Sequence, residues 1–171
     1  MGNSEIQKLK RTLGMGARSN KYRIMIPKLS EFGISNEMPD ILVKNTTMPG
    51  KSFTDVQVWV QGRQLTVAGD AVYEGSWNCT FHDTEDHILR NAFKDWMTYI
   101  DSFENHDRDA IDAKSYMTTI RIDQLSAIDN RRTTTCELQN AYVKSISEIS
   151  FADDASTLIE FSAEFNYSHW I

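Results

Sequence analysis

The sequence has few cysteines, only Cys79 and Cys136 among 171 residues. They lie far apart, each inside a run of strand-forming residues, and no CxxC pair is present. A structural zinc site needs clustered cysteine or histidine ligands, so this spacing argues against one. We expect both cysteines to be buried free thiols in a chain made in the cytosol, because disulfides are rare in reducing compartments.

The sequence also lacks a long hydrophobic run and an excess of positive charge. No stretch approaches the roughly 20 apolar residues of a membrane helix, so we expect no membrane insertion by this chain. The chain has 18 Lys and Arg against 24 Asp and Glu, a net charge of −6. Proteins that hold nucleic acid present a basic patch, which argues against that class. A surface that only lets DNA pass remains compatible with the charge.

The motifs of common enzyme classes are missing as well: the sequence has no phosphate loop, G-x-S-x-G elbow or HExxH motif. The one grouping that suggests chemistry is His82, Asp83 and His87. Positions 82 and 87 do not share a helix face, and a metal site would need further ligands. We expect no enzyme activity and no cofactor. A small β-barrel ligand-binding module or a metal enzyme that uses these three residues is the distant alternative.

Alternation of apolar and polar residues predicts a mainly β chain. The cleanest alternation is at the C-terminal end, where Phe161, Ala163 and Phe165 alternate with Glu160 and Glu164. This pattern predicts one buried face and one acidic, solvated face. We expect strands at residues 22–26, 41–47, 55–60, 64–67, 76–81, 116–122, 133–150 and 159–167.

Turn-forming residues separate these strands. Met48-Pro49-Gly50 and Gln61-Gly62 predict turns, and Gly69-Asp70 predicts a bend. Asp153-Asp154 predicts a further turn, and a kink is expected near Asn140 or Ser145 within the strand-like segment 133–150. Residues 28–39 are predicted to form a loop or an irregular excursion, and residues 104–115 a loop.

One segment changes to helical periodicity. From Asp83 onward, apolar residues recur every three or four positions, at Ile88, Leu89, Ala92, Phe93, Trp96 and Ile100. Asp83 or Thr84 is the expected N-cap. Phe93 and Trp96 are the expected anchors of this helix in the core, which Trp77 on an adjacent strand should share.

The pattern therefore favours a β-sandwich or barrel over residues 21–171, with one principal helix that covers one opening or flank. Residues 1–20 form a separate arm. Ile6, Leu9 and Leu13 predict a short helix in it, which Gly14 and Gly16 would end. The arm is either a frayed terminus or a segment ordered only against a neighbouring subunit on assembly.

Two tryptophans are candidates for a subunit interface. Trp59 faces away from the row formed by Val56, Val58 and Val60, and Trp170 lies next to the end of the sequence. Exposed aromatic residues are enriched at protein interfaces. The alternative is that they form a second layer of the core.

Several segments in a fixed order resemble one protein family. They are Met48-Pro49-Gly50, the QGRQLTVAGD segment from Gln61 to Asp70, the W-x-x-x-F strand from Trp77 to Phe81, the segment from Asp83 to Trp96 that ends in FKDW, and the aromatic C-terminal strand ending in Tyr167 and Trp170. With this order and spacing, the chain is similar to the tail tube proteins of contractile-tailed bacteriophages, which are related in fold to type VI secretion and pyocin tubes.

The resemblance implies a structural virion protein. Its protomers would form hexameric rings, stacked into the inner tube of a contractile tail that conducts DNA into the host. It implies contact with a tail sheath, a tape-measure protein, and baseplate and tail-terminator proteins, in the virion and, during assembly, in the host cytoplasm. The alternatives within the class are a baseplate-proximal tube initiator and a secretion-system tube subunit.

The resemblance also gives the acidic strand a possible role. DNA carries one negative charge per about 1.7 Å of its axis, so a conduit should not offer rows of lysine or arginine that hold it. Glu160 and Glu164 are our candidates for lining the channel.

Overall fold

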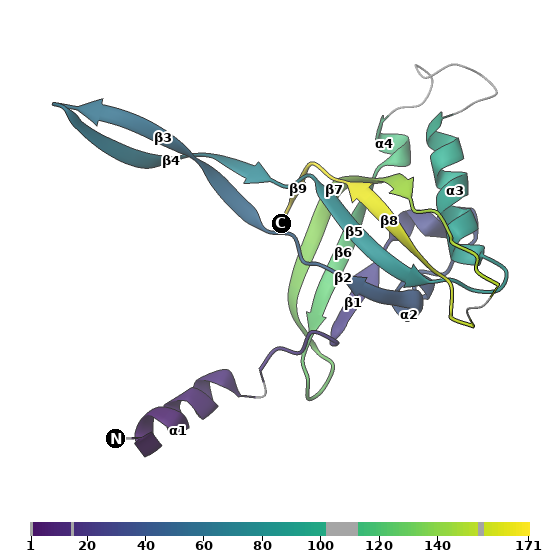
Figure 1. Cartoon of the computed structure of the whole chain (residues 1–171), viewed down its shortest axis with the longest axis horizontal. Coiled ribbons are helices and arrows are strands. Elements are labelled where there is room, and N and C mark those ends of the chain that lie inside the picture. Colours follow the sequence, from purple (N-terminus) through teal and green to yellow (C-terminus); the bar gives the residue numbers. More distant parts are fainter. Residues whose placement is uncertain (1, 15, 102–112, 154–155) are drawn as a thin grey trace.

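A computed structural model of the chain describes residues 2–14, 16–101, 113–153 and 156–171, and the chain is mainly β (Figure 1). The strands are β1 (Tyr22–Met25), β2 (Val43–Thr46), β3 (Lys51–Val60), β4 (Arg63–Tyr73), β5 (Ser76–His82), β6 (Thr118–Leu125), β7 (Arg132–Ile146), β8 (Glu160–Asn166) and β9 (His169–Trp170). The helices are α1 (Gly2–Leu13), the 3-10 helix η1 (Pro27–Phe32), α2 (Met38–Leu42), α3 (Ile88–Asp101) and α4 (Ala113–Tyr116).

Most strands form one curled antiparallel sheet in the order β1-β6-β7-β8-β5-β2, and β9 also pairs with β7. The two edges of this sheet approach each other. The Tyr22 hydroxyl on β1 donates a hydrogen bond to the Lys44 carbonyl on β2 at 3.1 Å, which links the two edge strands. Asp40 of α2 bridges the same gap, since its carboxylate accepts the Ile24 backbone N–H at 2.9 Å. The sheet and these bridges give a nearly closed barrel-like body.

Helix α3 covers one side of this body. The Phe93 ring lies 5.6 Å from the rings of Phe81 and Phe165 and 6.1 Å from that of Phe161. Trp96 is fully buried, and its indole N–H donates to the Tyr116 carbonyl at 2.9 Å. Each such buried apolar side chain contributes about 1.5–3 kcal/mol of transfer free energy. An aromatic cluster between α3, β5 and β8 therefore forms the centre of the core.

The long strand β7 bends at two positions. Its pairing with β6 shifts register between Leu138 and Ala141, and Asn140 within this interval has φ of 54°. Its pairing with β8 shifts register between Val143 and Ser145. Such bulges bend a strand and increase its twist. The expected kink near Asn140 or Ser145 is confirmed at both places, and it lets one strand pair with β6 at one end and β8 at the other.

The prediction of a loop or irregular excursion over 28–39 missed two short helices, because the segment forms most of η1 and the start of α2. Pro27 and Pro39 each occupy the first turn of a helix, where the missing N–H costs nothing. Gly33, with φ of 80°, ends η1 in the left-handed conformation. Strand β2 consequently begins at Val43 rather than at position 41.

The predicted start of the main helix was also wrong. Helix α3 begins at Ile88, after a turn in which His87 has φ of 51°. The Thr84 hydroxyl accepts the Ile88 backbone N–H at 3.3 Å from outside the helix. Tyr116 belongs to α4 rather than to a strand. Most of the 104–115 segment, and Asp154 of the Asp153-Asp154 turn, lie outside the described residues.

Both cysteines are free and buried. Burial raises the pKa of the Cys79 and Cys136 thiols above the usual range, which keeps them in the neutral form. Among the helices of the described ranges, none is both long and apolar enough to span a membrane.

Candidate functional site

Strands β3 and β4 form a hairpin that projects far from the body of the molecule (Figure 1). Every residue of β3 is exposed, and so is nearly all of β4. Gln61 and Gly62 connect the strands, and both have positive φ, 48° and 75°. Two residues with positive φ match the right-handed twist of a hairpin, so the turn predicted at these residues is confirmed.

A β-bulge divides the hairpin near its middle. Phe53 pairs with Ala71 and Asp55 pairs with Ala68, so Gly69 and Asp70 face the single residue Thr54. A Cβ atom on Gly69 would lie 2.5 Å from the Thr54 hydroxyl oxygen. The Gly69-Asp70 pair therefore marks a bulge in a continuous strand, where the sequence had suggested a bend.

One face of the hairpin is a contiguous apolar surface, which we call the valine face. In the β3–β4 register, Val56 pairs with Val67 and Val58 with Leu65, and Val60 continues the row. All five side chains are exposed. The cross-strand partners Leu65 and Val67 were not among the sequence candidates, although their alternation with Gln64 and Thr66 carries the signal.

The opposite face carries Phe53 and Trp59, which are also exposed, Trp59 by 66%. A two-stranded hairpin with both faces in water is at best marginally stable. An exposed apolar strand pair is also a template for association with another chain. The hairpin thus has the properties of an interface that is not yet covered.

Trp170 lies at the other end of the hairpin, at its base. Its indole N–H donates to the Gly50 carbonyl at 3.1 Å, and its ring packs edge-to-face on Tyr73 with centroids 6.4 Å apart. The Lys51 ammonium lies 5.2 Å from the Tyr73 ring centroid. The structure therefore does not bring the two candidate tryptophans together: Trp59 is near the tip, and Trp170 attaches the base to the body.

Glu160 and Glu164 lie on the outward face of β8, in the middle of the sheet. Each is half-buried and has a basic neighbour: Lys44 lies 2.7 Å from Glu160, and Lys144 lies 2.9 Å from Glu164. The hydrogen bond from Lys144 lowers the pKa of the Glu164 carboxyl. The face is polar with paired charges, which differs from the solvated acidic row that the alternation alone suggested. The partner lysines were missed because strand pairing is not written in local sequence.

His82, Asp83 and His87 do not converge. The His87 Nδ1 atom lies 2.5 Å from a carboxylate oxygen of the buried Asp83, whereas the His82 ring faces Glu160 at 3.5 Å. Across the described ranges, no group of three or more His, Cys, Asp or Glu side chains is placed to hold a metal ion. The arrangement offers a local turn contact and no ligand set.

Comparisons with known proteins agree with this architecture. The chain is similar to a structure from the baseplate of the anti-feeding prophage, at 15% identity and a TM-score of 0.62, with 91% of this chain and 93% of that chain covered. It is also similar to a chain of the PVC sheath–tube complex of an extracellular contractile injection system, at 11% identity and a TM-score of 0.60, covering 100% and 97%. A chain of the PVC sheath/tube terminator matches at 12% identity and a TM-score of 0.58, covering 90% and 94%. At these identities the likeness concerns the fold.

No curated protein sequence matches the chain significantly. A family model, however, covers residues 17–171, which is nearly the whole chain, and its family is described as phage tail tube protein. The mainly β body and the projecting hairpin are the structural counterpart of this match. The chain belongs to the phage tail tube protein family, and its role is that of a structural subunit of a tail tube.

Proposed function

We propose that copies of this chain associate into hexameric rings, stacked into the inner tube of a contractile tail, and that the β3–β4 hairpin makes contacts between copies. The observation that carries the proposal is the valine face, which is apolar and solvated in the single chain. The free outer edges of β3 and β4 supply unpaired backbone groups that a neighbouring sheet would satisfy. Trp59, near the tip, is the residue we assign to the interface.

The polar face of the sheet, with Glu160 and Glu164, lines the channel in this proposal. The opposite side of the body is apolar and covered by α3, so it is unsuited to face water or DNA. Each glutamate is paired with a lysine, so this face has no row of unpaired basic side chains that would bind DNA. This pairing supports a surface along which DNA slides without being held. The chain would then act in DNA ejection without catalysis and without a cofactor.

The remaining partners follow from position in a tail. A sheath would surround the tube, a tape-measure protein would occupy it during assembly, and baseplate and tail-terminator proteins would contact its ends. Similar folds occur in structures of a baseplate, a sheath–tube complex and a sheath/tube terminator, so the fold suits more than one level of such a particle. A tube initiator or an injection-system tube subunit is the second candidate. We place the protein in the virion, and in the host cytoplasm during assembly.

Negative-stain electron microscopy of the purified chain tests the proposal. Rings or tubes with a central channel are expected, and their number should rise with the protein concentration. Dispersed monomers under all conditions, including addition of preformed tubes as nuclei, would contradict it and would favour a small β-barrel binding module. A map of the tube with Glu160 and Glu164 on the outer wall would contradict the channel assignment alone.

A further inference from the structure

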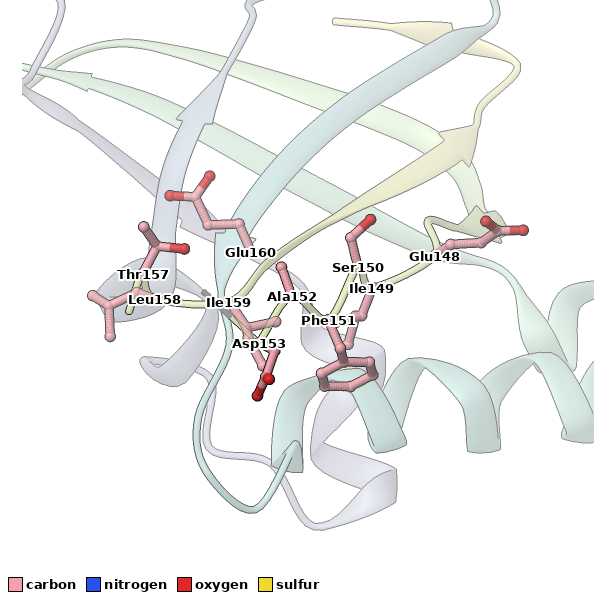
Figure 2. A pocket seen from close by; sticks show the side chains of 10 residues that line it. All are labelled: Glu148, Ile149, Ser150, Phe151, Ala152, Asp153, Thr157, Leu158, Ile159 and Glu160. Atoms are coloured by element: carbon pink, nitrogen blue, oxygen red, sulfur yellow. The ribbon is translucent and has the colours of Figure 1, made fainter. Parts of the chain in front are cut away.

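Residues 148–153 and 157–160 line an open groove of about 750 Å³ (Figure 2). We call it the 148–160 groove, and its lining residues are Glu148, Ile149, Ser150, Phe151, Ala152, Asp153, Thr157, Leu158, Ile159 and Glu160. Figure 2 shows Thr157 and Leu158 on one side of the groove and Phe151 near the start of α3 on the other. Phe151 is 78% exposed and Leu158 77%, so both large apolar side chains lie mostly in water.

The ionisable residues that line the groove are all acidic: Glu148, Asp153 and Glu160. Glu160 pairs with Lys44, whereas Glu148 and Asp153 have no ion-pair partner in the part of the chain that the structure describes. Arg90, in an adjacent hollow, already donates to the Ser147 carbonyl at 3.1 Å. The groove therefore combines exposed apolar side chains at its sides with uncompensated negative charge, which suits an apolar segment with a basic flank.

The same chain carries a segment of that kind. Helix α1 places Ile6, Leu9 and Leu13 on one face, and each of these side chains is at least half exposed. Lys8, Lys10 and Arg11 flank this apolar stripe, against the single acid Glu5. A helix of 12 residues is marginal in water without tertiary contacts, so α1 needs a surface to cover its stripe. In Figure 1 it stands away from the body, on the opposite side from the β7–β8 segment.

We propose that α1 of one copy docks its apolar stripe into the 148–160 groove of a second copy, with its lysines beside Glu148 and Asp153. Helix and groove are different surfaces, so each copy gives one helix and receives another. Such a heterologous contact repeats from copy to copy and generates a ring or an open stack. The inference rests on the proposed function, because a tube is the assembly in which the second copy is supplied.

Disulfide trapping between two variants of the full chain tests the contact directly. The Leu9→Cys variant is mixed with the Leu158→Cys variant under assembly conditions. The native Cys79 and Cys136 are buried, so we expect them not to form cross-links. The matched control replaces Leu158→Cys with Ile128→Cys, a side chain that is equally exposed, at 78%, on the turn between β6 and β7. We expect a cross-linked dimer from the first mixture and at least tenfold less from the second. Thr157→Cys serves as the groove variant if Leu158→Cys fails to fold.

The other outcomes overturn the proposal. Equal or absent cross-linking in the two mixtures would show that α1 does not use the groove. A chain carrying both Leu9→Cys and Leu158→Cys that closes its disulfide internally as a dilute monomer would show that α1 binds its own groove. If tubes form but the cross-link does not, the contact between α1 and the groove is contradicted and the proposed function stands. If the unmodified chain forms no tubes, the proposed function itself is contradicted.

Charge reversal gives an independent readout. Lys8→Glu with Lys10→Glu, or Glu148→Lys with Asp153→Lys, should each raise the concentration needed for assembly about tenfold, because two favourable pairs become repulsive. All four substitutions in one chain should restore assembly. The control is Lys94→Glu on the exposed side of α3, for which no change is expected. If each double variant assembles poorly and the variant with all four substitutions does not regain assembly, a direct pairing of the two surfaces is contradicted.

Discussion

The body and the β3–β4 hairpin are built from similar strands, yet they bury them differently. In β8 every second side chain is buried inside the body, whereas in β3 every side chain is exposed. The alternation that predicts a half-buried strand is present in both. The body thus completes its core within one chain, while the hairpin carries an apolar pattern that the same chain leaves exposed.

The largest expected effect lies in the body. Phe93→Ala should lower the free energy of unfolding by about 3–5 kcal/mol, because it leaves a cavity between three aromatic rings. Thermal or urea unfolding of the monomer measures this loss. The matched control is Phe53→Ala on the exposed hairpin, for which we expect a change within about 0.5 kcal/mol. Equal effects of the two substitutions would show that the hairpin contributes as much to monomer stability as the body does.

The next effect lies in the hairpin and concerns assembly. Trp59→Ala should leave monomer unfolding unchanged and weaken association by about 2 kcal/mol, which is roughly a 30-fold higher critical concentration. Sedimentation of tubes as a function of protein concentration measures it. Gln57→Ala, on the same face of the same strand, is the control and should have little effect. Normal assembly of the Trp59 variant would remove this residue from the interface.

The bulge gives a backbone test of the same hairpin. Gly69→Ala should weaken assembly by about 1–2 kcal/mol, because a Cβ atom would lie 2.5 Å from the Thr54 hydroxyl oxygen and 3.0 Å from its carbonyl oxygen. Gly50→Ala has open space at its Cβ and is the control. Tube yield at fixed concentration distinguishes the two. If both variants assemble like the unmodified chain, the hairpin geometry does not matter for association.

A smaller effect is expected where the hairpin joins the body. Trp170→Phe keeps the aromatic contact with Tyr73 and removes the hydrogen bond to the Gly50 carbonyl, which is worth about 0.5–1.5 kcal/mol. We expect faster hydrogen exchange at the base of β3, with the exchange of β8 unaltered. Unchanged exchange at the base would show that Trp170 does not fix the direction of the hairpin.

The smallest effect concerns the paired charges on the sheet. Lys144→Ala should raise the pKa of Glu164 toward the ordinary glutamate value of about 4.3, since the ion pair holds it lower. The sign follows from linkage: the pair is present above the unfolded pKa and is lost as the pH falls through the folded one. NMR titration of the carboxyl carbon measures the shift. Arg131→Ala, on a remote turn, should leave the titration of Glu164 unchanged.

Local features of the fold could be predicted from the sequence. Alternation located β5 and β8, the helical period located α3, and Gln61-Gly62 located the hairpin turn, because each pattern depends on neighbouring residues. The short helices η1 and α2 were missed, because helices of five or six residues are too short to show a helical period. The two-residue strand β9 is too short to show a period.

Long-range features could not be predicted in this way. The pairing of Lys44 and Lys144 with the two glutamates depends on the register of β8 against its neighbours, which no local pattern reveals. The alternating valines of the valine face could be recognised in the sequence, but their exposure could not. Alternation indicates that one face of a strand is apolar and does not indicate which element covers that face. Only the fold shows that this chain does not bury it.

Hydrogen exchange of residues 51–73, compared between monomer and assembled tube, tests whether the β3–β4 hairpin is the subunit interface. We expect fast exchange along β3 and β4 in the monomer and strong slowing on assembly, since a neighbouring copy would cover the valine face and pair the free edges. Strand β8, protected within the body, is the internal reference and should change little. Hairpin amides that exchange as fast in the tube as in the monomer would contradict the assignment of this hairpin as the subunit interface.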